Sequence, residues 1–92
     1  MEPVSPHSPI HAGAEVTIPT SGSVVVSTGL RYPLQAYGIA MAQAPAAGAA
    51  FVSAIPEPDD KSGIAKLKLL SYESDYTAGT VACKVSWTAL GK

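Results

Sequence analysis

The sequence predicts an all-β protein, a small antiparallel β-sandwich or jelly-roll-like barrel of about six strands with an extended N-terminal arm. Residues 80–92 supply the first observation, because apolar or small side chains alternate with polar ones from Val81 to Ala89. That period of two belongs to a strand with one buried face. The second observation is that five further extended segments lie upstream, between turns rich in Gly, Pro and Ser. Since one sheet cannot bury its own apolar side, two layers of strands are expected.

Length and composition set limits on the function. A chain of 92 residues makes one small domain, which buries roughly 60–65% of its extended-chain surface. Charged residues make up only 14% of the chain, against about 25% in an average soluble domain. We therefore expect uncovered apolar surface and association with other chains, the alternative being a compact sandwich rich in Ala, Ser and Thr. The net charge is −1 and the basic residues are scattered, which disfavours direct binding to nucleic acid.

Residues 1–14 differ in kind from residues 15–92 and are expected to form an extended N-terminal arm. Pro3, Pro6 and Pro9 recur every third residue, which is the period of a polyproline II helix. A disordered tail is one interpretation, and an arm that orders on a neighbouring subunit is the other. Under the second interpretation the residues expected to contact a partner are Val4, Pro6, His7, Pro9 and Ile10.

The arm is followed by two short predicted strands, residues 15–19 and 23–28. Val16 and Ile18 share one face of the first strand, and Val24 and Val26 are expected to face the core from the second. The connection Thr20-Ser21-Gly22 has turn chemistry. The two strands are therefore predicted to pair as a hairpin.

Residues 34–43 form the longest extended segment, and we expect a central strand there. Tyr37, Ile39 and Met41 line one of its faces. The other face carries only small residues, which permit close approach of another backbone. It is the candidate surface for packing against a second subunit, and its residues are Ala36, Gly38, Ala40 and Ala42. A helix is the competing interpretation, because alanine favours helices; the glycine, the β-branched Ile39 and the lack of charge count against it.

Two more strands are predicted before the last one, at residues 51–55 and 64–72. The second should turn Ala65, Leu67 and Leu69 inward and two lysines outward. In the final strand the only tryptophan, Trp87, is expected in the core. The only cysteine, Cys83, lies on the same face, where a small buried hydrophobe is the expected role.

The sequence gives no support for an enzyme, a metal site or a cofactor. His7 and His11 have the i, i+4 spacing of helical metal ligands, but Pro6 and Pro9 break any helix there. The carboxylates of residues 57–60 lack the alternating oxygen spacing of a calcium loop and are interpreted as a solvated acidic turn. Sugar binding is an open alternative. Asp75 could accept hydrogen bonds from sugar hydroxyls, and four aromatic side chains could stack on a pyranose: Tyr32, Tyr72, Tyr76 and Trp87.

No uninterrupted run of about eighteen apolar residues occurs, so no membrane partner is expected. The chain also shows no basic-then-apolar leader. We expect it to be made in a cytoplasm and either kept soluble or assembled there into something larger.

The ending Val85-Ser86-Trp87-Thr88-Ala89-Leu90-Gly91 resembles the V-x-W-x-A-x-G ending of H-type-lectin-like sandwiches, which also occur in phage fibre proteins. Together with residues 27–31 and 45–52, it is also similar to small Ala/Gly-rich virion proteins of tailed bacteriophages. The similarity runs over roughly residues 15–91 and rests on low-complexity motifs. The sugar-contacting residues of the lectin family cannot be carried over, because only the terminal strand aligns.

The resemblance implies a capsid decoration (cement) protein or another small structural protein of the virion, located on the capsid surface and assembled in the host bacterial cytoplasm. Its implied partners are the major capsid protein and copies of itself, as a dimer or trimer. In this interpretation the arm residues contact the capsid lattice and the small residues of 36–42 contact a second copy. A lectin-like receptor-binding tip of a tail fibre, recognising host surface glycans, is the alternative.

Overall fold

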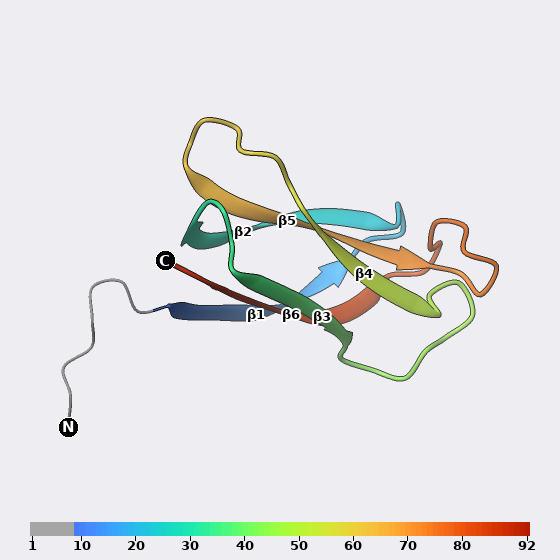
Figure 1. Cartoon of the computed structure of the whole chain (residues 1–92). Helices are drawn as coiled ribbons and strands as arrows, with labels where there is room; N and C mark the ends of the chain where they lie inside the picture. The colour runs from blue at the N-terminus through green and yellow to red at the C-terminus, as the bar shows by residue number, and fades with distance from the viewer. Residues whose placement is uncertain (1–8) are drawn as a thin grey trace, which may run out of the picture.

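The computed structural model describes residues 9–92 and confirms the all-β sandwich (Figure 1). Each of its two layers is a three-stranded antiparallel sheet, with the strand orders β1-β6-β3 and β2-β5-β4. The six strands are β1 (Ile10–Ile18), β2 (Ser23–Arg31), β3 (Ala36–Met41), β4 (Phe51–Pro56), β5 (Ile64–Tyr72) and β6 (Cys83–Gly91). β6 and β5 are therefore the middle strands of the two layers.

The inner faces of β6 and β5 form most of the core. In β6 the alternate residues Cys83, Val85, Trp87 and Ala89 are buried, and the indole of Trp87 retains only 6% exposure. This confirms the predicted alternation, because every second side chain of a strand points to the same face. Burial of these side chains against the opposite layer supplies the main apolar driving force for folding.

The opposite inner face continues the same pattern. Ala65, Leu67 and Leu69 of β5 are buried as predicted, and Ser71 extends the buried row. Val24 and Val26 pack against this core from β2, also as predicted. Further along β2, the hydroxyl of Thr28 donates a 2.7 Å hydrogen bond to the backbone oxygen of Ala65, which satisfies a buried polar group.

The predicted hairpin between the first two strands is wrong. β1 pairs with β6, whereas β2 pairs with β5, so residues 19–22 cross from one layer to the other. Gly22 sits at φ +89°, and its N–H donates to the oxygen of Pro19 at 3.0 Å. The turn was recognisable, but local turn chemistry does not say whether the next strand joins the same sheet or the facing one.

β1 is longer than the predicted strand at residues 15–19, since it begins at Ile10. Ile10 lies opposite Gly91 and Ala14 lies opposite Trp87, so residues 10–14, expected in the arm, belong to the sheet. The backbone N–H and C=O groups of β6 are paired with β1 along its whole length. This pairing makes β1 longer than the alternation of its own side chains predicts.

The expected central strand at residues 34–43 lies at an edge. β3 covers only Ala36–Met41 and is the last strand of the order β1-β6-β3. Its edge and that of β4 lie alongside each other on one side of the sandwich, as do β1 and β2 on the other (Figure 1). Residues 9–92 include no helix of the length and hydrophobicity needed to cross a membrane.

Candidate functional site

The predicted contact residues fall into two groups. Val4, Pro6 and His7 lie outside the described residues, so their part in any contact stays a prediction. Pro9 is exposed just before β1, and Ile10, the first residue of β1, is 55% exposed. The second group comes from residues 36–42 and lies on the outer side of the β1-β6-β3 sheet.

The middle of that outer side is a small-residue face, made up of Gly13, Ala36, Gly38, Ala40, Ser86 and Thr88. Larger side chains lie around it on the same outer side, among them Lys84 and Glu15, which form an ion pair at 3.5 Å. Strand register places these residues in rows, since Gly13 and Gly38 both lie opposite Thr88. The side chains of Ala36 and Ala40 are exposed and Gly38 is half-buried. Ala42 is exposed just beyond β3, where its N–H donates to the oxygen of Lys84 at 2.9 Å. The four predicted residues therefore share one side of the sheet, where a hollow of about 260 Å³ lies beside Ala36 and Thr88.

The outer side of the β2-β5-β4 sheet is different in chemistry. Here large apolar side chains are exposed, with Val25 at 50%, Phe51 at 45% and Ile55 at 49%. Val25 and Ile55 both lie opposite Lys68 on the middle strand, and Lys68 has no carboxylate within 4.0 Å among residues 9–92. We call this surface, with Leu70 and Tyr72 beside it, the large-residue face. This face was not predicted from the sequence. Its signal was that residues 51–55 carry apolar side chains on both sides of the strand, so that one apolar side had to face outward.

The large-residue face ends at a pair of stacked aromatic rings. The centroids of Phe51 and Tyr76 are 5.4 Å apart and the ring planes are 10° from parallel. Tyr76 is 75% exposed and has a positive φ of 68°, which is uncommon for a bulky residue. The loop around it is held by hydrogen bonds: Tyr76 donates its N–H to the oxygen of Glu73, and the hydroxyls of Thr77 and Thr80 donate to the Glu73 carboxylate. The ring of Tyr76 is thus presented on an ordered loop.

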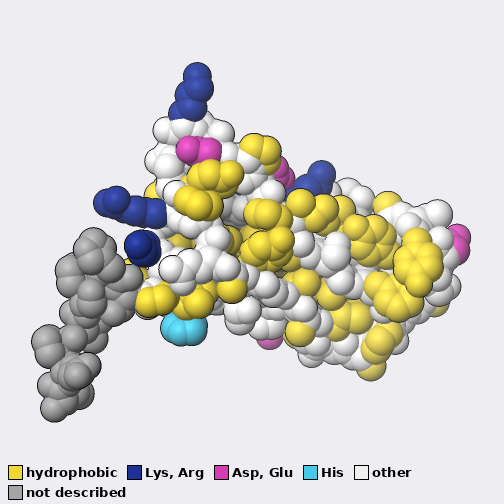
Figure 2. All heavy atoms as spheres, viewed as in Figure 1, with side chains coloured by type: hydrophobic (Ala, Val, Ile, Leu, Met, Phe, Trp, Pro, Cys, Tyr) yellow, Lys and Arg dark blue, Asp and Glu magenta, His cyan; other side chains and the backbone are white. Residues whose placement is uncertain are grey.

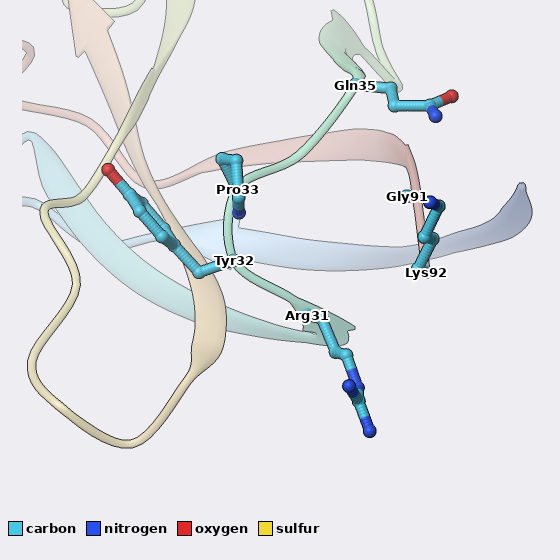
Figure 3. A pocket seen from close by; sticks show the side chains of 6 residues that line it. All are labelled: Arg31, Tyr32, Pro33, Gln35, Gly91 and Lys92. Atoms are coloured by element: carbon cyan, nitrogen blue, oxygen red, sulfur yellow. The ribbon is translucent and has the colours of Figure 1, made fainter. Parts of the chain in front are cut away.

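A third surface feature lies where the chain passes from β2 to β3. Two hollows there share Tyr32 and Pro33. The smaller, about 130 Å³, is completed by Leu34, Tyr37, Pro56, Glu57, Ala65 and Lys66. The larger, about 310 Å³, is completed by Arg31, Gln35, Gly91 and Lys92 (Figure 3). We call the two together the tyrosine groove.

Backbone hydrogen bonds hold the tyrosine groove open. The N–H of Arg31 donates to the oxygen of Lys92 at 2.6 Å, that of Tyr32 to Gly63 at 2.9 Å, and that of Gln35 to Leu90 at 2.7 Å. The Tyr32–Pro33 peptide bond is cis. Apolar side chains gather along the side of the sandwich formed by β3 and β4, whereas most of the charged side chains in this view lie at one end and on the loops (Figure 2). The groove is therefore a shaped, largely apolar site, with Arg31 and Lys92 at its larger hollow and Glu57 and Lys66 at its smaller one.

The acidic residues organise their own loops. The Lys66 ammonium hydrogen-bonded to Asp60, helped by donors from Ser62, holds the pKa of that carboxyl well below its usual range. Likewise, the hydroxyl and N–H of Thr77 lower the pKa of Asp75. In residues 9–92, no three His, Cys, Asp or Glu side chains are grouped as metal ligands would be.

The sugar-binding hypothesis loses two of its aromatic residues. Trp87 is in the core and has no free face for stacking. Tyr72 is half-buried, and its hydroxyl lies 3.2 Å from the hydroxyl of Ser53. Cys83 is fully buried as expected, and burial raises the pKa of its thiol. Tyr76 is left as the ring with an open face, together with the partly exposed tyrosines of the groove.

Comparison of the chain with known protein families, with curated proteins and with solved structures found no match. What the protein does is therefore inferred from its own residues and surfaces.

Proposed function

We propose that this chain is a non-enzymatic structural protein of a virion, a capsid decoration (cement) protein that binds and stabilises the major capsid protein lattice of a tailed phage. The observation that carries the proposal is the large-residue face. Val25, Phe51 and Ile55 are about half exposed on the rigid strands of one sheet, in a chain of low overall charge. A surface of this kind gains free energy when a partner covers it.

The mechanism is burial of apolar surface at the junctions between lattice subunits. Burial of apolar area contributes about 25 cal/mol per Å² before the cost of association is subtracted. Strand residues are already ordered, so they add little to that cost. Binding only to the assembled lattice would stabilise it by mass action. Lys68, at the middle of the face without a nearby carboxylate among residues 9–92, favours a partner that presents an acidic group there.

Copies of the chain are proposed to pack through the small-residue face. Ala36, Gly38 and Ala40 let another backbone approach closely, and β3 itself carries no charged side chain. The charges of Lys84 and Glu15 on the neighbouring strands are paired with each other. In this arrangement the large-residue face binds the lattice and the small-residue face binds a second copy.

Co-sedimentation with empty shells of the major capsid protein tests the proposal. The purified protein should pellet with the shells, and the double variant Val25→Ser/Ile55→Ser should bind at least about tenfold more weakly, because it loses apolar contact area. Thr17→Ser, on the opposite outer side, is the matched control and should bind as the wild type does. Circular dichroism checks that each variant is folded. No binding by the wild-type protein, or equal binding by the double variant, would contradict the proposal.

A glycan-binding fibre tip is the second candidate, and the exposed ring of Tyr76 is the observation that favours it. Aromatic rings stack on the apolar face of a pyranose, and Asp75 lies next to Tyr76 in the chain. The carboxylate of Asp75 already accepts hydrogen bonds from Thr77, which weakens this candidate. Binding of the isolated protein to host polysaccharide, lost in Tyr76→Ala, would support the fibre tip over the decoration protein.

A further inference from the structure

We propose that the tyrosine groove binds the proline-spaced segment, residues 2–9, of a second copy of this chain. The inference goes beyond the decoration function and does not require it, since it concerns how copies of the protein join one another. It commits the segment to a second copy instead of the lattice.

The groove has the chemistry that recognises proline. Tyr32 and Tyr37 are 43% and 45% exposed, and Pro33 and Pro56 stand beside them. Proline-rich segments in polyproline II conformation dock in grooves lined by aromatic side chains, because the pyrrolidine ring packs flat against an aromatic ring. A hollow of about 130 Å³ is large enough for one or two such rings.

The segment has the matching pattern. Pro3, Pro6 and Pro9 repeat every third residue, so in a polyproline II helix all three fall on the same side. Such a helix loses little entropy on binding, because proline already restricts the free chain.

Charge is also complementary. Glu2 is the only acidic residue among residues 1–9. The larger hollow of the groove is lined by Arg31 and Lys92, and neither has a carboxylate within 4.0 Å among the residues that the structure describes (Figure 3). The smaller hollow also contains Glu57 and Lys66, and the ammonium group of Lys66 is paired with Asp60. The cations of the larger hollow therefore fit the single carboxylate of the proline-spaced segment.

Strand geometry favours a second copy over the chain's own segment. Ile10 begins β1 opposite Gly91, so the segment joins the sandwich at the end where the groove lies. To enter its own groove, the segment would have to reverse its direction within a few residues. Ser5 and Ser8 each precede a proline and are restricted to extended conformations, which disfavours such a reversal. In polyproline II conformation the segment would extend by about 3.1 Å per residue, which suits contact with a neighbouring molecule.

Binding of the segment of one copy in the groove of the next is a head-to-tail contact, because the segment and the groove are different surfaces. Head-to-tail contacts close into rings or continue as chains, and their population rises with protein concentration. The small-residue face is not needed for it.

The experiment uses a synthetic peptide of residues 1–10 and the protein lacking residues 1–8, which keeps all of β1. Nuclear magnetic resonance titration should show saturable binding, with the largest shifts at Tyr32, Tyr37 and their neighbours. Tyr32→Ala should weaken binding about tenfold, which corresponds to one lost aromatic contact. Tyr76→Ala, which removes an exposed tyrosine elsewhere, is the matched control and should leave binding unchanged. A peptide with Pro3→Ala and Pro6→Ala should bind more weakly than the original.

Sedimentation of the full chain decides between the chain's own segment and a second copy. The mass of the full chain should rise with concentration and that of the truncated protein should rise less. The proposal is overturned if the peptide fails to bind, if Tyr32→Ala binds it as well as Tyr76→Ala, or if the full chain self-associates no more than the truncated one. None of these outcomes concerns capsid shells, so failure of the decoration function would be seen separately.

Discussion

The two sheets of this sandwich share one core and differ on the sides that they turn to solvent. β1-β6-β3 presents mainly glycine, alanine, serine and threonine outward, with the Lys84–Glu15 ion pair among them. β2-β5-β4 presents Val25, Phe51 and Ile55 outward, with lysines on its middle strand. The inner sides, by contrast, carry the same kind of apolar row in both middle strands. Folding therefore constrains the inner sides alike and leaves the outer sides free to differ, so the differences indicate what each outer side contacts.

A face of small residues and a face of large apolar residues suit different neighbours. The first lets two backbones approach closely but buries little apolar area per residue. The second offers more apolar area and a central cation, and is better suited to a chemically distinct partner than to a copy of itself, which would bring two Lys68 ammonium groups together. This is why we assign the lattice to the large-residue face.

The largest change in the free energy of unfolding is expected when a buried leucine and its half-buried neighbour in the same strand are each replaced by alanine. Leu69 of β5 is fully buried, and the next residue, Leu70, lies half-buried on the large-residue face. Leu69→Ala should lower the free energy of unfolding by about 2–5 kcal/mol, because it leaves a cavity in the core. Leu70→Ala should cost about 1 kcal/mol or less. Urea denaturation measures both, and equal losses would contradict the distinction between the two sides.

A smaller effect is expected from two glycines that flank Thr88 on the small-residue face. A Cβ at Gly13 would lie 2.9 Å from the backbone oxygen of Trp87, whereas one at Gly38 would meet only the Thr88 hydroxyl, at 3.5 Å. Gly13→Ala should therefore lower the thermal midpoint. Gly38→Ala should raise it, by about 0.4–1 kcal/mol in stability, because alanine reduces the entropy of the unfolded chain. If both variants shift the midpoint in the same direction, the described packing of this face is wrong.

The smallest effect concerns the ion pair of Asp60 and Lys66 at the rim of the large-residue face. Because the folded pKa of Asp60 is lowered, the pair stabilises the protein above the ordinary carboxyl pKa of 3.8 and is lost as the pH falls through the lowered value. Asp60→Asn should thus be slightly less stable than the wild type at pH 7, with the difference shrinking on acidification and in high salt. Thermal midpoints at pH 7, 4 and 2 provide the measurement, and a difference that grows toward low pH would count against the pair.

Most of the fold was predictable because burial leaves a local signature. The inward residues of β5 and β6 follow from alternation alone, and so do Val24 and Val26 of β2. Strand partners were less predictable. The hairpin was inferred from neighbourhood in sequence, and the central position of residues 34–43 from apolar or small residues on both faces. In the structure β1 and β3 each pair with β6, the last of the six strands.

The candidate surfaces were predictable only in part. The small-residue face follows from alternation at Ala36, Gly38 and Ala40, because three small residues at a period of two share a side wherever the strand lies. The large-residue face was missed, since Val25 and Ile55 are 30 positions apart and meet only across β5. The tyrosine groove likewise joins Tyr32 to Pro56 and Lys92 through the packing of three separate segments.

The amino-acid sequence by itself determined that there are six strands and roughly where each lies, which side of β5 and β6 is buried, and that a second layer must cover it. These features depend on side-chain polarity at a fixed short period. Only the tertiary structure decided which strands are neighbours, and hence which exposed residues share a surface. That choice depends on contacts between distant parts of the chain, whose free energies no local pattern expresses.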